Sequence, residues 1–194
     1  MSEEIEGHPF EPYIPDNAKI LMLGTFPPKP DKWSMDFYYP NWINDMWRIM
    51  GLIFYSDPNH FIIEGKKQFD LDQIKAFLNI RGIGLYDTGV KVHRLKGNAS
   101  DKFLEIVERI DLNRILNSNM RISSIVSTGE KAASIVSEIS MSRLPKMGEC
   151  VDFKFDNKIY HHFRMPSSSR AYPMSLAKKS EFYASMFKIN GFQL

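Results

Sequence analysis

The chain has 194 residues, of which 43% are hydrophobic, and a formal net charge of +2. This length predicts one domain around one hydrophobic core, and the nearly balanced charge neither requires nor excludes a polyanionic partner, because a local basic face can hide in a balanced total. The single cysteine, Cys150, excludes an internal disulfide and a cysteine-ligated iron–sulfur cluster. No apolar run reaches the ~18 residues of a membrane span, and the acidic first residues are unlike a signal peptide. We therefore expect no membrane partner and a reduced intracellular, cytoplasmic setting.

Strands and helices alternate along the first half of the chain. Residues 1–7 form a polar tail that we expect to be frayed. The buried strand expected at 19–23 ends at Gly24 in a loop rich in proline and aromatic residues. Asp70 is expected to cap a helix that ends near Gly82, as in a capping box. The expected elements are a strand at 19–23, a helix at 43–54, a helix from 70 to 82 and a strand at 83–86.

The second half continues this alternation and ends with a hairpin and a helix. An Asp-Asn pair at 156–157 marks the hairpin turn. The expected elements are helices at 101–110 and 112–116, a strand at 122–127, a helix at 129–139, strands at 151–155 and 158–163, and a helix at 175–188. Strands that alternate with helices predict an α/β fold, with a parallel sheet covered by helices on both faces.

Three expected strands end in loops with polar or ring-bearing residues. The loops are 24–27, 87–88 and 165–169. Because the carboxyl ends of parallel strands meet at one edge of a sheet, we expect these loops to form a ligand site there. Phe26, Phe37, Tyr38 and Tyr39 supply flat faces near the first loop, which suggests a planar ring as the ligand.

Several segments together resemble the uracil-DNA glycosylase superfamily, and most closely its hypoxanthine/uracil and mismatch-specific DNA glycosylase-like branch. The likeness extends over about residues 8 to 187. The segments that carry it are His8-Pro9-Phe10, Ile20 to Pro27, Phe37 to Pro40 with Asn44 and Trp47, Gly82 to Asp87 with Arg94 and Gly97, Val126 to Gly129, and Met165 to Ala171.

The resemblance implies a three-layer α/β/α domain with a central four-stranded parallel sheet. It also implies a DNA repair enzyme that hydrolyses the N-glycosidic bond of a deaminated base, uracil or hypoxanthine, and leaves an abasic site in base excision repair. The base must leave the stack before its bond to the sugar is reachable. On this basis we expect a monomer without a cofactor, acting on double-stranded or single-stranded DNA, and associated with the nucleoid if the protein is bacterial.

The resemblance also assigns candidate catalytic and base-binding residues. Asn44 matches a catalytic asparagine of the hypoxanthine-type branch, with an exposed polar residue at a helix start as the alternative. Thr25 stands near the position where relatives carry an Asp or Asn that handles the water. Met165 stands where many relatives carry a His or Asn that contacts the base, so the leaving group needs another donor here. The base-binding candidates are Gly24, Phe26, Pro27, Tyr39 and Met165.

The last loop resembles the segment that clamps phosphates and fills the gap left by the flipped base. The DNA-binding candidates are Ser167, Ser168, Ser169, Arg170 and Arg94. Lys91, His93 and Lys96, with Lys178 and Lys179, could extend a basic DNA face or be ordinary solvated charges. Asp87 could orient a DNA-contacting loop or cap a turn, and His161 and His162 should face opposite sides of their strand.

Two other functions remain open on the sequence alone. A non-catalytic damaged-DNA or nucleotide-binding protein on the same fold would account for Thr25 and Met165. A small-molecule α/β enzyme with a serine nucleophile is disfavoured, because no Gly-x-Ser-x-Gly elbow is present. We expect no metal site, since no Cys/His cluster has the spacing of metal ligands.

Overall fold

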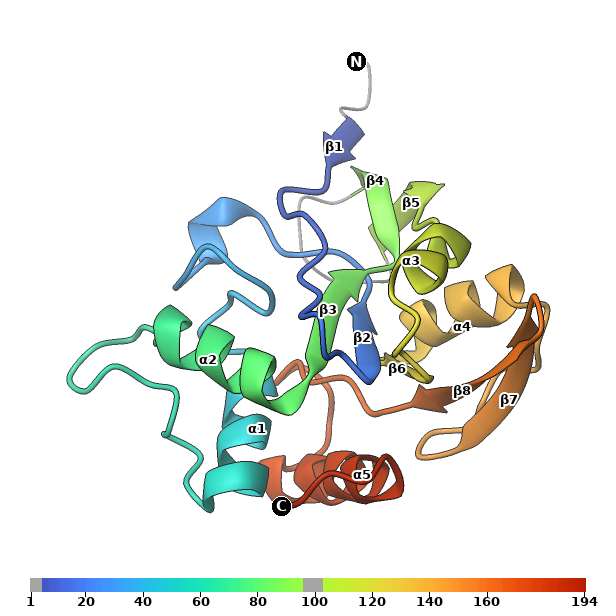
Figure 1. Cartoon of the computed structure of the whole chain (residues 1–194). Helices are drawn as coiled ribbons and strands as arrows, with labels where there is room; N and C mark the ends of the chain where they lie inside the picture. Colours follow the sequence, from blue (N-terminus) through green and yellow to red (C-terminus); the bar gives the residue numbers. More distant parts are fainter. Residues whose placement is uncertain (1–4, 96–102) are drawn as a thin grey trace.

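The computed structural model describes residues 5–95 and 103–194, and its centre is a five-stranded sheet in the order β3-β2-β6-β8-β7 (Figure 1). Four of these strands are parallel to one another: β3 (Ile83–Asp87), β2 (Ile20–Gly24), β6 (Ser124–Ser127) and β8 (Lys158–Arg164). The edge strand β7 (Cys150–Phe155) is antiparallel to β8.

The expected α/β class is therefore confirmed, but the expected four-stranded parallel sheet is wrong. The central sheet has five strands of mixed orientation. The reason is the short turn between β7 and β8, because a two-residue connection joins only antiparallel neighbours. The sequence had indicated both strands of this hairpin without showing that they extend the central sheet.

Helices lie on both sides of this sheet (Figure 1). On one side, α1 (Met46–Tyr55) packs against α5 (Leu176–Ile189), and on the other α4 (Glu130–Ile139) contacts β6 and β8. The remaining helices are α2 (Leu71–Arg81), α3 (Leu112–Ser118) and the short 3-10 turn η1 (Pro30–Lys32). Within the described residues, no helix is both long and apolar enough to cross a membrane.

A second, three-stranded sheet corrects two expectations. It consists of β1 (Ile5–Gly7), β4 (Gly89–Arg94) and β5 (Leu104–Arg109), all antiparallel. The helix expected over 101–110 is wrong for 104–109, because pairing with β4 determines the conformation there. Residues 5–7 of the expected frayed tail are strand β1, and residues 1–4, 96–100 and 101–102 lie outside the described part.

The expected start and end of α2 are confirmed. The Asp70 side chain accepts a hydrogen bond from the Gln73 backbone N–H at 3.0 Å, and Gly82 ends the helix in the left-handed conformation. All five residues of β2 are buried, as a strand covered on both faces requires. Because β2 is held in the core along its whole length, the position of its last residue, Gly24, at the edge of the sheet is well defined. The candidate site begins there.

Candidate functional site

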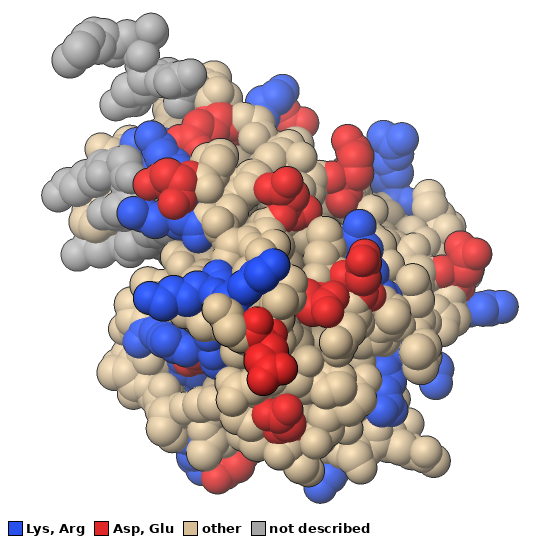
Figure 2. Space-filling model, turned by 90° about the vertical axis from the view of Figure 1, so that its left-hand side faces the viewer, with Lys and Arg blue, Asp and Glu red and all other residues tan. Residues whose placement is uncertain are grey.

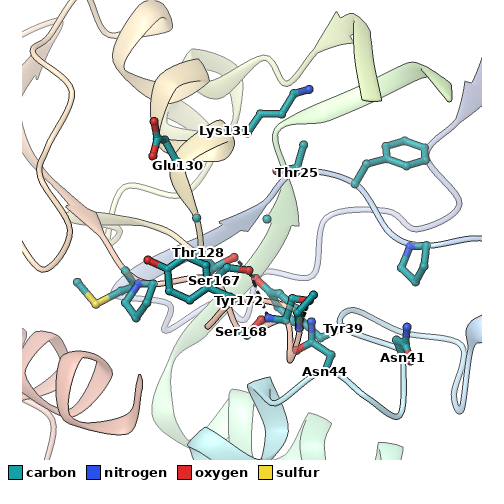
Figure 3. A pocket seen from close by; sticks show the side chains of 18 of the residues that line it. Thr25, Tyr39, Asn41, Asn44, Thr128, Glu130, Lys131, Ser167, Ser168 and Tyr172 are labelled. Atoms are coloured by element: carbon teal, nitrogen blue, oxygen red, sulfur yellow. Dashed lines mark hydrogen bonds between the residues drawn. The ribbon is translucent and has the colours of Figure 1, made fainter. Parts of the chain in front are cut away.

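A cavity of about 910 Å³ lies at the carboxyl edge of the central sheet (Figure 3). Most of its wall comes from four segments: residues 24–28 at the end of β2, 39–44 except Trp42 before α1, 128–131 at the start of α4, and 164–173 except Arg170 at the end of β8. Asp87, at the end of β3, also lines it. The structure thus brings together the three loops that the sequence placed at this edge.

Gly24 is a position where only glycine fits. A Cβ atom added there would lie 2.4 Å from the Asp87 Oδ1 and 3.6 Å from the Tyr39 hydroxyl oxygen. The Gly24 carbonyl accepts a hydrogen bond from the Thr88 N–H at 2.9 Å. The bare backbone therefore lets the Asp87 carboxyl reach the floor of the cavity.

Asp87 is paired with a histidine from the start of the chain. The His8 Nε2 lies 2.9 Å from the Asp87 Oδ2, and both side chains are buried. Burial raises the pKa of the Asp87 carboxyl above its usual value, and the hydrogen bond from His8 opposes this rise. Asp87 is therefore part of the pocket floor and not a turn cap alone.

Phe26 stands at the cavity wall between His8 and Arg94. Its ring meets the His8 ring edge to face, with centroids 5.3 Å apart, and the Arg94 guanidinium lies 5.7 Å from the Phe26 ring centroid. The carbonyl of Pro27, the next residue, accepts a hydrogen bond from Arg94 at 3.1 Å. These contacts fix the orientation of the Phe26 ring, which is the property that a stacking platform needs.

Arg94 itself corrects an expectation. Its side chain is only 2% exposed and forms two-pronged hydrogen bonds to the Glu6 carboxylate at 2.9 to 3.2 Å. A guanidinium that is buried and paired in this way does not lie on an exposed face, so Arg94 is not placed to contact DNA phosphates. Its guanidinium instead contacts the Phe26 ring and donates to the Pro27 carbonyl, and so stabilises this loop.

Tyr39 closes one side of the cavity, whereas Tyr38 belongs to the core. The Tyr39 hydroxyl lies 3.0 Å from the Thr128 Oγ1, and burial is the main reason that the pKa of the Tyr39 phenol rises far above its usual range. Tyr39 therefore keeps its proton and can donate a hydrogen bond. Tyr38 is buried and donates to the Glu11 carbonyl at 2.8 Å, away from the cavity lining.

Asn44 joins the loop before α1 to the loop after β8. Its backbone forms an antiparallel bridge with Ser169, and the neighbouring Asp45 N–H donates to the Ser168 carbonyl at 2.8 Å. The Asn44 Oδ1 accepts a hydrogen bond from the Met46 N–H at 2.9 Å. The side-chain oxygen thus caps the helix start, and the Asn44 amide group also lines the cavity (Figure 3).

The Met165–Ser169 loop forms the wall that contacts Asn44. Met165 is buried, and its N–H donates to the Ser127 carbonyl at 2.8 Å. Ser167 and Ser169 accept hydrogen bonds from backbone N–H groups two residues further on, at 3.3 and 3.2 Å. These local turns give the loop a fixed shape with serine side chains at the cavity.

Below this loop lies an ionic cluster that the sequence did not reveal, formed by Asp45, Arg170 and Lys179. The Asp45 carboxylate accepts from the Arg170 Nε at 2.8 Å and from the Lys179 Nζ at 3.1 Å. Lys179 also donates to the Ser169 carbonyl at 2.8 Å and is 0% exposed, so it does not extend a DNA face. Arg170 is half-exposed and paired, and it does not line the cavity.

The structure therefore gathers most of the candidate residues around one cavity. Those that line it are Gly24, Thr25, Phe26, Pro27, Tyr39, Asn44, Met165, Ser167, Ser168 and Ser169. Figure 3 shows Asn44, Tyr39 and Ser168 together on one side, with Thr25 and Lys131 toward the other. Asp87 and Thr128 also line the cavity, although the sequence gave them no base-binding role. The sequence feature that could have identified both residues as part of the cavity is their position at the carboxyl end of an expected strand.

Charge on the surface is mixed. Figure 2 shows Asp and Glu side chains distributed over one face of the molecule, with Lys and Arg side chains closer together toward one border. This distribution agrees with the small net charge of +2. Any contact with a polyanion must therefore rely on local groups and not on the field of the whole molecule.

No known protein-family profile matches the chain, and no curated protein sequence matches it. A solved structure does: the solution NMR structure of a proposed uracil DNA glycosylase from Methanosarcina acetivorans. It is similar over 97% of this chain and 100% of its own length, with a TM-score of 0.64 and 20% sequence identity. At that identity the likeness shows a shared fold, and the chemistry of the site must be argued from this chain's own residues.

Proposed function

We propose that the protein is a DNA glycosylase that hydrolyses the N-glycosidic bond of a flipped-out deaminated base, uracil or hypoxanthine. The observation that carries this proposal is the convergence of Phe26, Asn44 and Asp87 on one cavity at the carboxyl edge of the sheet. The full-length structural likeness to a proposed uracil DNA glycosylase supports it. The closeness to the hypoxanthine/uracil branch rests on the sequence motifs alone.

The cavity suits a planar base with polar edges. In the proposed complex the Phe26 ring, already held by His8 and Arg94, stacks on the base. Asp87 and the Gly24 backbone form the floor, where a carboxylate oxygen can accept a hydrogen bond from the N–H that uracil and hypoxanthine both carry. The protonated Tyr39 phenol lies beside this floor, 3.6 Å from the place of a Cβ on Gly24.

Bond cleavage needs a placed water more than a strongly activated nucleophile, because glycosidic cleavage has an oxocarbenium-like transition state. We assign the water to Asn44. Its side-chain oxygen accepts a hydrogen bond from the Met46 N–H, and its backbone is fixed by the bridge to Ser169, so little reorganisation is needed during the reaction. The Thr25 carbonyl accepts a hydrogen bond from the Gly89 N–H at 2.9 Å, and the Thr25 hydroxyl is a second polar group at the cavity wall.

The departing base carries negative charge that the protein must stabilise. Met165 has no polar hydrogen to give, so the donors in this proposal are backbone N–H groups and the Tyr39 hydroxyl. On the DNA side, Ser167 and Ser169 approach the phosphates next to the flipped nucleotide, since small hydroxyl side chains and backbone N–H groups suit phosphate oxygens. Ser168 is buried between them and shapes the loop. Arg170 contributes only if DNA displaces it from Asp45.

The proposal is tested with oligonucleotides that carry one uracil, one hypoxanthine or one mismatched thymine, in single and double strands. Base loss is detected by alkaline cleavage at the abasic site. We expect strand scission at uracil or hypoxanthine with the wild-type protein, and strongly reduced scission with Phe26→Ala. Asn117→Ala, an exposed position on α3, is the matched control and should retain wild-type rates. Absence of scission on every substrate would contradict the proposal.

A second function is a non-catalytic binder of damaged DNA or nucleotides on the same fold. One observation favours it: the Asn44 Oδ1 already accepts the Met46 N–H, so part of its capacity to hold a water is used for helix capping. Tight binding to abasic DNA without base release from any substrate would establish this alternative.

A further inference from the structure

The outer hairpin of the central sheet carries three metal-binding side chains on one face. β7 and β8 pair antiparallel, with Asp152 directly opposite His161, and Cys150 opposite Phe163. Because side chains alternate between the two faces of a strand, Cys150 and Asp152 share a face, and His161 joins them across the pair. The sequence had not indicated this cluster because its members come from two strands and have no local ligand spacing.

The donor atoms of this cluster are close enough for one ion. The Cys150 Sγ, an Asp152 carboxylate oxygen and a His161 ring nitrogen all lie within 4.8 Å of one another. The His161 Nδ1 lies only 2.7 Å from the Asp152 Oδ1. Ligands of a tetrahedral zinc ion, bound at about 2.0–2.3 Å, lie roughly 3 to 4 Å apart. Small side-chain rotations would therefore complete the geometry.

Apart from the Asp152–His161 contact, which the ion would replace, no hydrogen bond among the described residues engages these three side chains. The carboxylate of the nearby Glu149 accepts two hydrogen bonds from Arg143 and one from the Lys146 N–H, so we do not include it among the metal ligands. Cys150 and Asp152 are exposed and lie on the edge strand, where an ion has access from solvent. The candidate site is separate from the cavity, because none of its three residues lines it.

We propose that Cys150, Asp152 and His161 bind one Zn²⁺ ion, with a water in the fourth coordination position. Thiolate, imidazole and carboxylate together favour Zn²⁺ or Co²⁺ over Mg²⁺ and Ca²⁺, which prefer oxygen ligands alone. On binding, the Cys150 thiol releases its proton to solvent and the sulfur–metal bond forms. The bound ion links β7 to β8 and stabilises the folded state against the metal-free protein.

The test is a titration of the chelator-treated full chain with Co²⁺, followed by Zn²⁺ competition. We expect one ion per chain, a thiolate-to-cobalt charge-transfer absorption band, and loss of that band when Zn²⁺ is added. Cys150→Ser should abolish the band, and Asp152→Asn and His161→Ala should each weaken affinity by about tenfold or more. Asp156→Asn, the same change at an exposed acid in the turn of this hairpin, is the matched control and should bind like the wild type.

A Zn²⁺-dependent rise in melting temperature that disappears in Asp152→Asn but not in Asp156→Asn would support the site independently. Binding without the thiolate band, or equal binding by Asp152→Asn, His161→Ala and the wild type, would show an adventitious ion only and overturn the proposal. None of these readouts depends on glycosylase activity.

Discussion

The Lys179 Nζ lies 3.1 Å from the Asp45 Oδ2, and the Lys179 side chain is fully buried. This contact joins α5 to the start of α1 directly below the loop that faces the cavity. Lys179 also donates to the Ser169 carbonyl at 2.8 Å. One side chain therefore connects the segment before α1 with the loop after β8, and both of these segments contribute to the cavity wall. The candidate site therefore depends on an ionic group that lies beneath its surface.

Lys179→Met should destabilise the protein by about 3 kcal/mol, because it removes one partner of a buried ion pair. Urea unfolding measures this change. Lys178→Met is the matched control: its ammonium is exposed and pairs with Glu181 on the surface, where an ion pair contributes about 0–1 kcal/mol. Equal effects of the two substitutions would contradict the structural role of Lys179.

Gly24→Ala should disturb the floor of the cavity, because the new Cβ would meet the Asp87 Oδ1 at 2.4 Å. We expect a loss of about 1–3 kcal/mol in the free energy of unfolding, as for other overpacked sites, and a lower rate of base release. Gly7→Ala, where nothing lies within 4 Å of the added atom, is the comparison. Unaltered stability and base release in Gly24→Ala would show that Asp87 is not held against this backbone.

His162 should make the protein sensitive to acid. It is fully buried, its Nε2 lies 2.8 Å from the Ser127 Oγ, and burial lowers its pKa to about 4 from 6.5. The fold favours neutral His162, so this contribution to stability is complete above pH 6.5 and declines as the pH falls toward about 4. The loss should reach about 2 kcal/mol near pH 5.

Urea unfolding of the wild type and of His162→Gln at neutral and mildly acidic pH measures this effect, with a chelator present. The variant should lose less stability than the wild type between the two conditions. Parallel pH profiles for His162→Gln and the wild type would contradict the assignment.

The sequence predicted the elements whose signals are local and missed those set by distant pairing. The buried run at Ile20–Gly24 and the Asp70 cap were confirmed because burial and capping are visible in consecutive residues. Leu104–Arg109 became a strand because β4 pairs with it, and β7 joined the sheet through its hairpin with β8. Such partners lie outside any short window of sequence.

The same limit applies to the site. The wall of the cavity follows from strand ends, so the sequence could place Gly24, Phe26 and Met165 at the edge of the sheet where they line the cavity. The positions of the charged residues were predicted less well. Arg94 and Lys179 were expected at the surface, but each is buried and paired with an acidic residue that lies far away in the sequence. Ion pairing between elements decides whether a basic residue is exposed, and it depends on the tertiary structure.

The most direct test of the proposed function is to identify the free base released from duplexes that carry a single uracil or hypoxanthine, by chromatography with mass detection under single-turnover conditions. We predict that the wild type releases the free base and leaves an abasic site, and that Asn44→Ala slows release by about 10²- to 10³-fold, as for other losses of one positioned polar group. Binding to abasic DNA should persist in the variant. Wild-type protein that binds abasic DNA but releases no base from either duplex would contradict the account.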